Sequence, residues 1–114
     1  MPIWKTRSVS EESEITLTEW RIFEVDDGQR YFVGTRPETL SARVSSAIVK
    51  FDVASRKGIT QTGRTYKLVG PPGFSFDSAY VWNAWTTIYK VENVKDVTLA
   101  MLDGDYLVEP PHSS

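Results

Sequence analysis

Apolar and polar positions alternate over much of the first two thirds of the chain, in the pattern of short strands. Residues 14–25 are rich in β-branched and aromatic side chains and show no helical stripe, so we expect a strand there. The segment 26–29 contains Gly28, which suits the positive φ of a hairpin turn, and the strand pattern resumes over 30–34. This part of the sequence predicts a first hairpin.

Residues 43–53 predict one further strand with one buried face, because apolar side chains occupy alternate positions. A turn at 55–58 and two short strands at 59–62 and 65–69 predict a second hairpin. The prolines of segment 70–73 end it, since proline lacks a backbone donor and does not continue a central strand. The alternating apolar positions of 43–53 are Ala47, Val49, Phe51 and Val53.

The segment 78–91 favours a largely buried helix that Asp77 or Ser78 caps. A strand is the alternative, because the segment contains many β-formers at alternate positions, which share one face of a strand. The short run 97–102 fits either a closing strand or a last helical turn. The helix would carry two adjoining apolar stripes, made of Val81, Trp85 and Ile88 and of Tyr80, Ala84 and Val91.

These elements predict an α+β fold, in which a small antiparallel sheet of about 4–6 strands in hairpins packs with one helix in the C-terminal half. An all-β fold is the alternative if 78–91 is a strand. A chain of 114 residues without an internal linker predicts a single domain over 1–114, with flexible ends at about 1–10 and 109–114. Its one core is expected to include Val49, Phe51, Tyr66, Leu68, Trp85 and Ile88.

Charge is segregated along the chain, although the net charge is only −2. Residues 8–27 hold seven acids and one base, whereas residues 28–70 hold eight bases and two acids. A basic stretch on strands predicts a surface that binds a polyanion or another partner. The alternative is an ordinary solvent-exposed sheet face, whose charge the acidic first strand neutralises. The residues of this expected surface are Arg43, Lys50, Arg56, Lys57, Arg64 and Lys67.

The densest aromatic cluster lies in the expected helix and contains Tyr80, Trp82, Trp85 and Tyr89. Such a cluster can form a stacking platform or a cage for a cation. Burial in the core is the interpretation that we favour, since aromatic residues dominate small cores. Trp82 is the member expected to lie nearest the surface.

The residue inventory offers little chemistry. The chain has no cysteine, and its one histidine, His112, is two residues from the end. Neither a dinucleotide fingerprint nor a phosphate-binding loop is present, and the acidic residues occur in turns and in one acidic stretch. The sequence therefore predicts no catalytic residue, no cofactor and no metal site.

The leading hypothesis is a non-enzymatic binding or accessory module that acts on a protein partner through its sheet face. One alternative is binding of nucleic acid or another polyanion through residues 43–69. A second is an enzyme that needs neither His nor Cys. We also expect a monomer or weak homodimer in the cytoplasm and no contact with membranes, because the sequence shows neither a signal peptide nor an apolar span.

Overall fold

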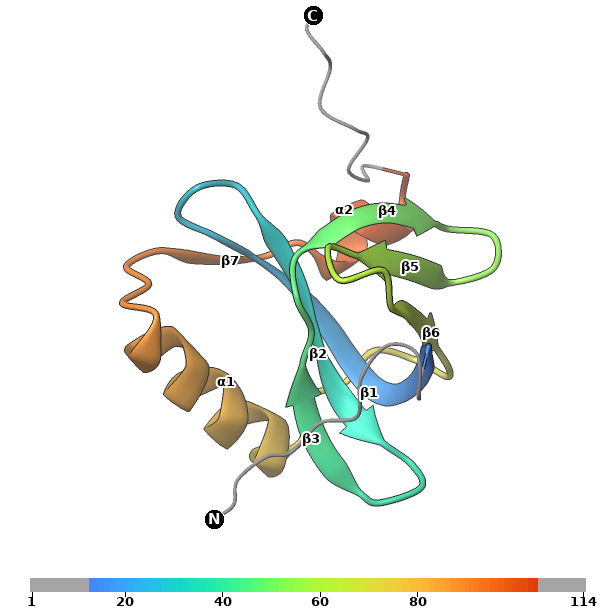
Figure 1. Cartoon of the computed structure of the whole chain (residues 1–114), viewed down its shortest axis with the longest axis horizontal. Helices are drawn as coiled ribbons and strands as arrows, with labels where there is room; N and C mark the ends of the chain where they lie inside the picture. The colour runs from blue at the N-terminus through green and yellow to red at the C-terminus, as the bar shows by residue number, and fades with distance from the viewer. Residues whose placement is uncertain (1–12, 105–114) are drawn as a thin grey trace, which may run out of the picture.

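The computed structural model of the protein describes residues 13–104. Its first strand, β1 (Glu14–Val25), is long and bent, and its two parts pair with different strands of the sheet (Figure 1). Its first part, Glu14 to Leu17, pairs in parallel with a later strand, and its second part pairs antiparallel with the next strand. The pairing register shifts between Thr18 and Arg21. Glu19 has a φ of 48° at this place, so the strand bends there.

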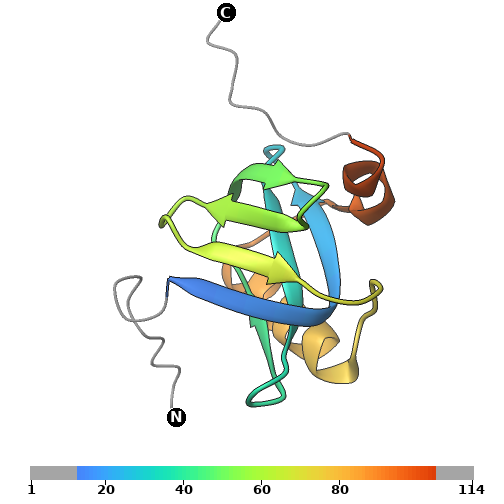
Figure 2. The same ribbon diagram turned by 90° about the vertical axis from the view of Figure 1, so that its right-hand side faces the viewer.

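Within residues 13–104 the chain forms seven strands and two helices, and the strand order is β3-β2-β1-β6-β5-β4, with β7 also paired to β1. Strands β2 and β3 form a hairpin, and β4, β5 and β6 form an antiparallel meander that lies beside the first part of β1 (Figure 2). The elements after β1 are β2 (Arg30–Arg36), β3 (Ser41–Val44), β4 (Ile48–Asp52), β5 (Lys57–Thr60), β6 (Thr65–Leu68), α1 (Phe76–Ile88), β7 (Val94–Asp96) and α2 (Thr98–Leu102).

The bend in β1 lets one strand supply side chains to two clusters of buried residues. Past the bend, Ile22 points into the larger cluster and Phe23 into a smaller one on the other face, under α1. The smaller cluster contains Phe23, Val25, Val33 and Trp82, with Tyr31, Val44, Trp85 and Val91 packed against it. The larger cluster contains Ile15, Leu17, Trp20, Ile22, Phe32, Ile48, Phe51, Tyr66, Leu68, Val97 and Met101.

The α+β prediction is confirmed, since a mostly antiparallel sheet packs against one main helix. The predicted first strand and first hairpin are also found, as β1 and its pairing with β2. The sheet differs from the expectation in its parallel pairing of β1 with β6. That pairing joins segments about fifty residues apart, and no local pattern in the sequence indicates it.

The single strand predicted over 43–53 is wrong, because the chain leaves one half of the sheet and enters the other within it. Its first residues belong to β3, which pairs with β2, and its last residues form β4, which pairs with β5. The crossing is held at Ser45, whose backbone N donates to Phe32 O at 2.9 Å and whose Oγ accepts from Phe32 N at 2.9 Å. The hydroxyl of a buried serine therefore takes the place of a backbone carbonyl as the acceptor for Phe32 N.

The predicted core is right for Phe51, Tyr66 and Leu68 and wrong for Val49. The register of β4 against β5 shifts between Ile48 and Lys50, so the alternation of faces is interrupted there. Ile48 is buried as a result, and Val49 is 43% exposed.

The late segment is a helix, as favoured, but it begins and packs differently from the prediction. Ser75 is the N-cap, and its side chain accepts a hydrogen bond from Ser78 N at 3.0 Å. Trp82 was expected near the surface and is instead buried against Phe23, whereas Ile88 was expected in the core and is exposed. Apolar residues occur on several sides of α1, so the sequence alone did not indicate which side faces the sheet.

The run 97–102, for which strand and helix remained open, forms the short helix α2. The predicted flexible ends at 1–10 and 109–114, with His112, lie outside the described residues. Within the described part of the chain, neither helix has the length and apolar character that a membrane span requires.

Candidate functional site

A continuous series of aromatic rings lies between α1 and the sheet. Phe23 stacks on Trp82 with the ring centroids 4.8 Å apart, and Trp82 stacks on Trp85 at 5.1 Å with only 9° between the ring planes. Trp85 in turn contacts Tyr31 at 4.6 Å and Tyr89 at 4.7 Å. The aromatic cluster seen in the sequence is therefore partly core, through Trp82, and partly exposed, through Tyr89.

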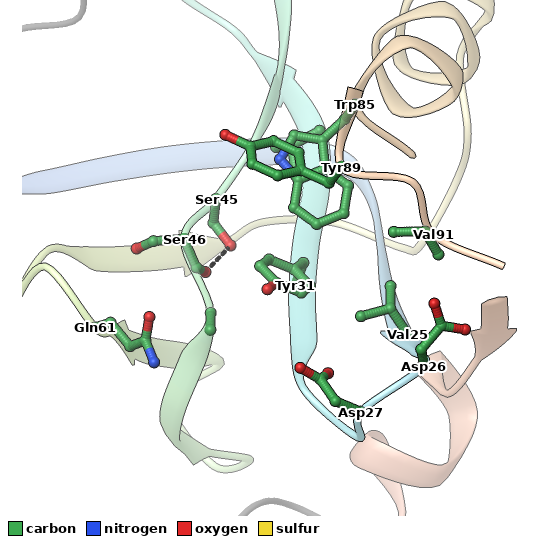
Figure 3. Close-up of a pocket in the computed structure, with 12 residues that line it drawn as sticks. Val25, Asp26, Asp27, Tyr31, Ser45, Ser46, Gln61, Trp85, Tyr89 and Val91 are labelled. Atoms are coloured by element: carbon green, nitrogen blue, oxygen red, sulfur yellow. Dashed lines mark hydrogen bonds between the residues drawn. The ribbon is translucent and has the colours of Figure 1, made fainter. Parts of the chain in front are cut away.

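The outer end of this ring series borders a pocket of about 510 Å³ at the C-terminal end of α1 (Figure 3). The β1–β2 turn forms one wall, the crossing between β3 and β4 forms another, and the end of α1 forms the third. The lining residues are Val25, Asp26, Asp27, Tyr31, Val44, Ser45, Ser46, Ala47, Gln61, Trp85, Tyr89 and Val91.

Asp26 fastens the β1–β2 turn to the segment that follows α1. Its carboxylate oxygens accept hydrogen bonds from Glu92 N at 2.8 Å and from Asn93 N at 2.5 Å. The hydrogen bond from Glu92 N is the main reason that the pKa of Asp26 lies below its ordinary value, because it stabilises the charged form. Both oxygens of Asp26 thus serve the fold, and Figure 3 shows its carboxylate turned away from Tyr31.

Asp27 has a different environment on the same turn. One of its carboxylate oxygens accepts from Gln29 N at 3.2 Å, and the side chain points toward Tyr31 in Figure 3. The Tyr31 hydroxyl donates to Gln29 Oε1 at 2.9 Å. Burial, followed by the negative charge of Asp27, raises the pKa of Tyr31, so this phenol is neutral at physiological pH.

The side of α1 that faces away from the sheet carries a row of side chains at i, i+4 spacing, which we call the α1 ridge: Phe76, Tyr80, Ala84 and Ile88. Phe76 is 95% exposed, Tyr80 is 75% exposed and Ile88 is 69% exposed. The ridge ends beside Tyr89, which lines the pocket. The ridge and the pocket therefore come closest to each other at the C-terminal end of α1, where Ile88 precedes Tyr89.

The six basic residues that the sequence grouped together do not form one surface in the structure. The three arginines of the group contact aromatic rings or are buried. Arg43 Nε donates to the Tyr66 hydroxyl at 2.8 Å, and the guanidinium lies 5.9 Å from the centre of that ring. The Arg56 guanidinium lies 5.8 Å from the centre of the Trp20 ring. Arg64 is only 7% exposed. Arg43 and Arg56 therefore pack on aromatic rings of the larger core cluster, and Arg64 is buried.

The three lysines of the group do share one surface, the outer face of the β4–β5–β6 meander. Lys57 and Lys67 are direct cross-strand partners, and Lys50 lies on the neighbouring strand. Acidic residues occur on the same face, since Asp52 is the cross-strand partner of Lys57 and Glu14 Oε2 lies 3.3 Å from Lys57 Nζ. The lysine face therefore carries charges of both signs.

The sequence does not indicate this pocket, since Asp26 and Asp27 resemble ordinary turn residues and Ser45 lies inside the strand predicted over 43–53. No group of three or more His, Cys, Asp or Glu side chains in residues 13–104 is placed to hold a metal ion.

Comparison with known proteins gives no relative: no protein-family model, no curated protein and no solved structure matches the chain.

Proposed function

We propose that this protein is a non-enzymatic binding module that holds a protein partner against the α1 ridge and the pocket at its end. The observation that carries this proposal is the exposure of Phe76, Tyr80 and Ile88 on a helix whose opposite side is packed in the core. Contiguous apolar side chains on a surface are characteristic of interaction sites, because their contact with water is unfavourable until a partner covers them.

The spacing of the ridge suits a protein surface in particular. Side chains at i, i+4 positions form ridges that fit between the side chains of a second helix. The pocket next to the ridge offers a place for one anchoring side chain of the same partner, in the way that buried anchors dominate protein interfaces.

The chemistry of the pocket favours binding over catalysis. A general acid among carboxylates needs a raised pKa, whereas the pKa of Asp26 is lowered and its oxygens are occupied by Glu92 N and Asn93 N. The Tyr31 phenol has a raised pKa, which makes it a poor proton donor at neutral pH. These groups suit the recognition of a partner.

The test is a purification of the tagged protein from its own host, with wild type compared with the double variant Phe76→Ser, Tyr80→Ser. Both side chains are exposed, so we expect stability to change by only about 0.5 kcal/mol. Leu99→Ser is the matched control, because Leu99 is an exposed apolar residue on α2. We expect a protein that wild type and the control retain and that the double variant loses, with and without nuclease treatment.

Two results would contradict the proposal. Retention of the same proteins by the double variant would remove the ridge as the binding surface. A concentration-dependent dimer of wild type in analytical ultracentrifugation, absent in the double variant, would make the ridge a contact between two copies of this chain. We expect a monomer.

Polyanion binding is the second candidate, and the cross-strand pairing of Lys57 with Lys67 favours it, because two like charges side by side attract an anion. Asp52 and Glu14 on the same face weaken that field. We therefore rank it below a protein partner.

A further inference from the structure

The pocket beside the C-terminal end of α1 has the composition of a site for a cation. Two carboxylates and three aromatic rings line it, and among the described residues that line it there is no Lys or Arg. We infer that this pocket receives the guanidinium group of an arginine side chain of the partner, an inference that rests on the binding function proposed above. The partner segment that crosses the ridge would place this arginine at its end.

Asp27 supplies the charge for this site. Asp26 is engaged with Glu92 N and Asn93 N, but Asp27 accepts only from Gln29 N among residues 13–104. The second oxygen of Asp27 therefore has room for a donor from outside the chain. Charge-assisted hydrogen bonds from a guanidinium to a carboxylate are among the strong ones in proteins.

The aromatic residues supply the second element of the site. Tyr31, Trp85 and Tyr89 lie in contact around the pocket, at centroid separations of 4.6 Å and 4.7 Å (Figure 3). The negative face of an aromatic ring attracts a cation within about 6 Å of its centre. Tyr89 is 63% exposed, which makes its ring available to an incoming side chain.

A guanidinium fits these two elements better than an ammonium does. It is planar, so it stacks on a ring while its edge donates hydrogen bonds to a carboxylate, whereas the lysine ammonium is a compact and more strongly hydrated charge. The apolar stem of arginine matches the aliphatic part of the lining, which is formed by Val25, Val44, Ala47 and Val91. A volume of about 510 Å³ accommodates the side chain together with part of its backbone.

The direct test is an NMR titration of the isotope-labelled chain with acetyl-Gly-Arg-Gly-amide. Two matched probes replace the arginine by lysine or by citrulline, which has nearly the shape of arginine without its charge. We expect saturable shifts of the Trp85 indole and of the amides of Asp27 and Tyr31 with the arginine probe. Binding of the lysine probe should be several-fold weaker, and the citrulline probe should cause no saturable shift.

Variants assign the charge to one residue. Asp27→Asn keeps the size of the side chain and should weaken binding of the arginine probe by about tenfold or more, since it removes the charge that the guanidinium meets. Asp103→Asn removes the same charge from an exposed position at the end of α2 and is the control. It should bind the probe like wild type.

Three results would overturn the inference: shifts of equal size with citrulline, unchanged binding by the Asp27 variant, or arginine-induced shifts confined to residues outside the pocket. These failures differ from failure of the proposed function. If the partner is lost with the ridge variant while the pocket ignores the arginine probe, the binding module stands and only the arginine assignment is wrong. If the probe binds but the ridge variant keeps every partner, the proposed docking surface is wrong.

Discussion

Gly58 on β5 lies directly against the ring of Phe32, so close that a Cβ added to Gly58 would fall 2.7 Å from Phe32 Cε2 and nearer still to Cζ. Phe32 is fully buried between Phe51 and Tyr66 and has no space to move away. We therefore expect Gly58→Ala to lower the free energy of unfolding by about 1–3 kcal/mol through overpacking. Chemical denaturation measures it.

The control for this prediction is Ile59→Ala at the next position, where the side chain faces outward and is partly exposed. It should cost clearly less than Gly58→Ala. An Ala at position 58 that left the unfolding midpoint unchanged would mean that the Phe32 ring relaxes freely, in conflict with the packing described.

Phe51 and Val49 are two positions apart, so a regular strand would place their side chains on the same face. The bulge in β4 instead leaves Phe51 buried and Val49 exposed. Phe51→Ala should cost about 3–5 kcal/mol, because it opens a cavity in the larger cluster. Val49→Ala should cost less than about 1 kcal/mol, because Val49 is exposed. Thermal unfolding of the two variants checks the pair, and equal losses would contradict the register shift between Ile48 and Lys50.

Ser75 caps α1, whereas the sequence pointed to Asp77 or Ser78, so substitutions at Ser75 and Asp77 should have different effects. Ser75→Ala removes the acceptor for Ser78 N and should cost about 1 kcal/mol. Asp77→Asn loses only a favourable charge in the first turn and should cost about 0.3–1 kcal/mol at low salt, with less effect at high salt. Unfolding curves at two ionic strengths distinguish the two roles.

Asp26 predicts a dependence of stability on pH. The pKa of Asp26 is lower in the folded chain than in the unfolded chain, so the charged carboxylate stabilises the fold. This stabilisation is complete above the unfolded pKa of about 3.9 and is lost as the pH falls through the folded pKa. The gap in melting temperature between wild type and Asp26→Asn should therefore be wider at neutral pH than in acid. Asp103→Asn, which changes an exposed carboxylate at the end of α2, is the matched control variant. A gap that widened in acid would contradict the sign of this pKa shift.

The lysine face leads to a prediction about nucleic acid. We expect any binding of labelled oligonucleotides at low salt to disappear near 150 mM salt, where the Debye length is about 8 Å, since Asp52 and Glu14 offset the lysines. The triple variant with Lys50, Lys57 and Lys67 changed to Gln should lose the low-salt binding. Persistent wild-type binding at 150 mM salt that the triple variant lacks would instead favour the polyanion hypothesis.

Local patterns in the sequence predicted the elements whose signals are short-range. The strand at 14–25, the turn at Gly28 and the helix after the proline segment were all found, because β-propensity, turn chemistry and segment length act within a few residues. The pocket at the end of α1 lay beyond such reasoning. It combines Asp27, Ser46 and Tyr89, which are far apart in the chain.

The sequence by itself favoured an α+β fold with one helix in the C-terminal half, since composition and local periodicity indicate these features, and it left an all-β fold open. Only the tertiary structure decided which faces are buried. The bulges at Thr18 to Arg21 and at Ile48 to Lys50 each shift the parity of a strand, and the stacking of Trp82 on Phe23 selects the inner side of α1. These choices depend on long-range pairing and packing, because a residue's exposure is set by the partners that cover it.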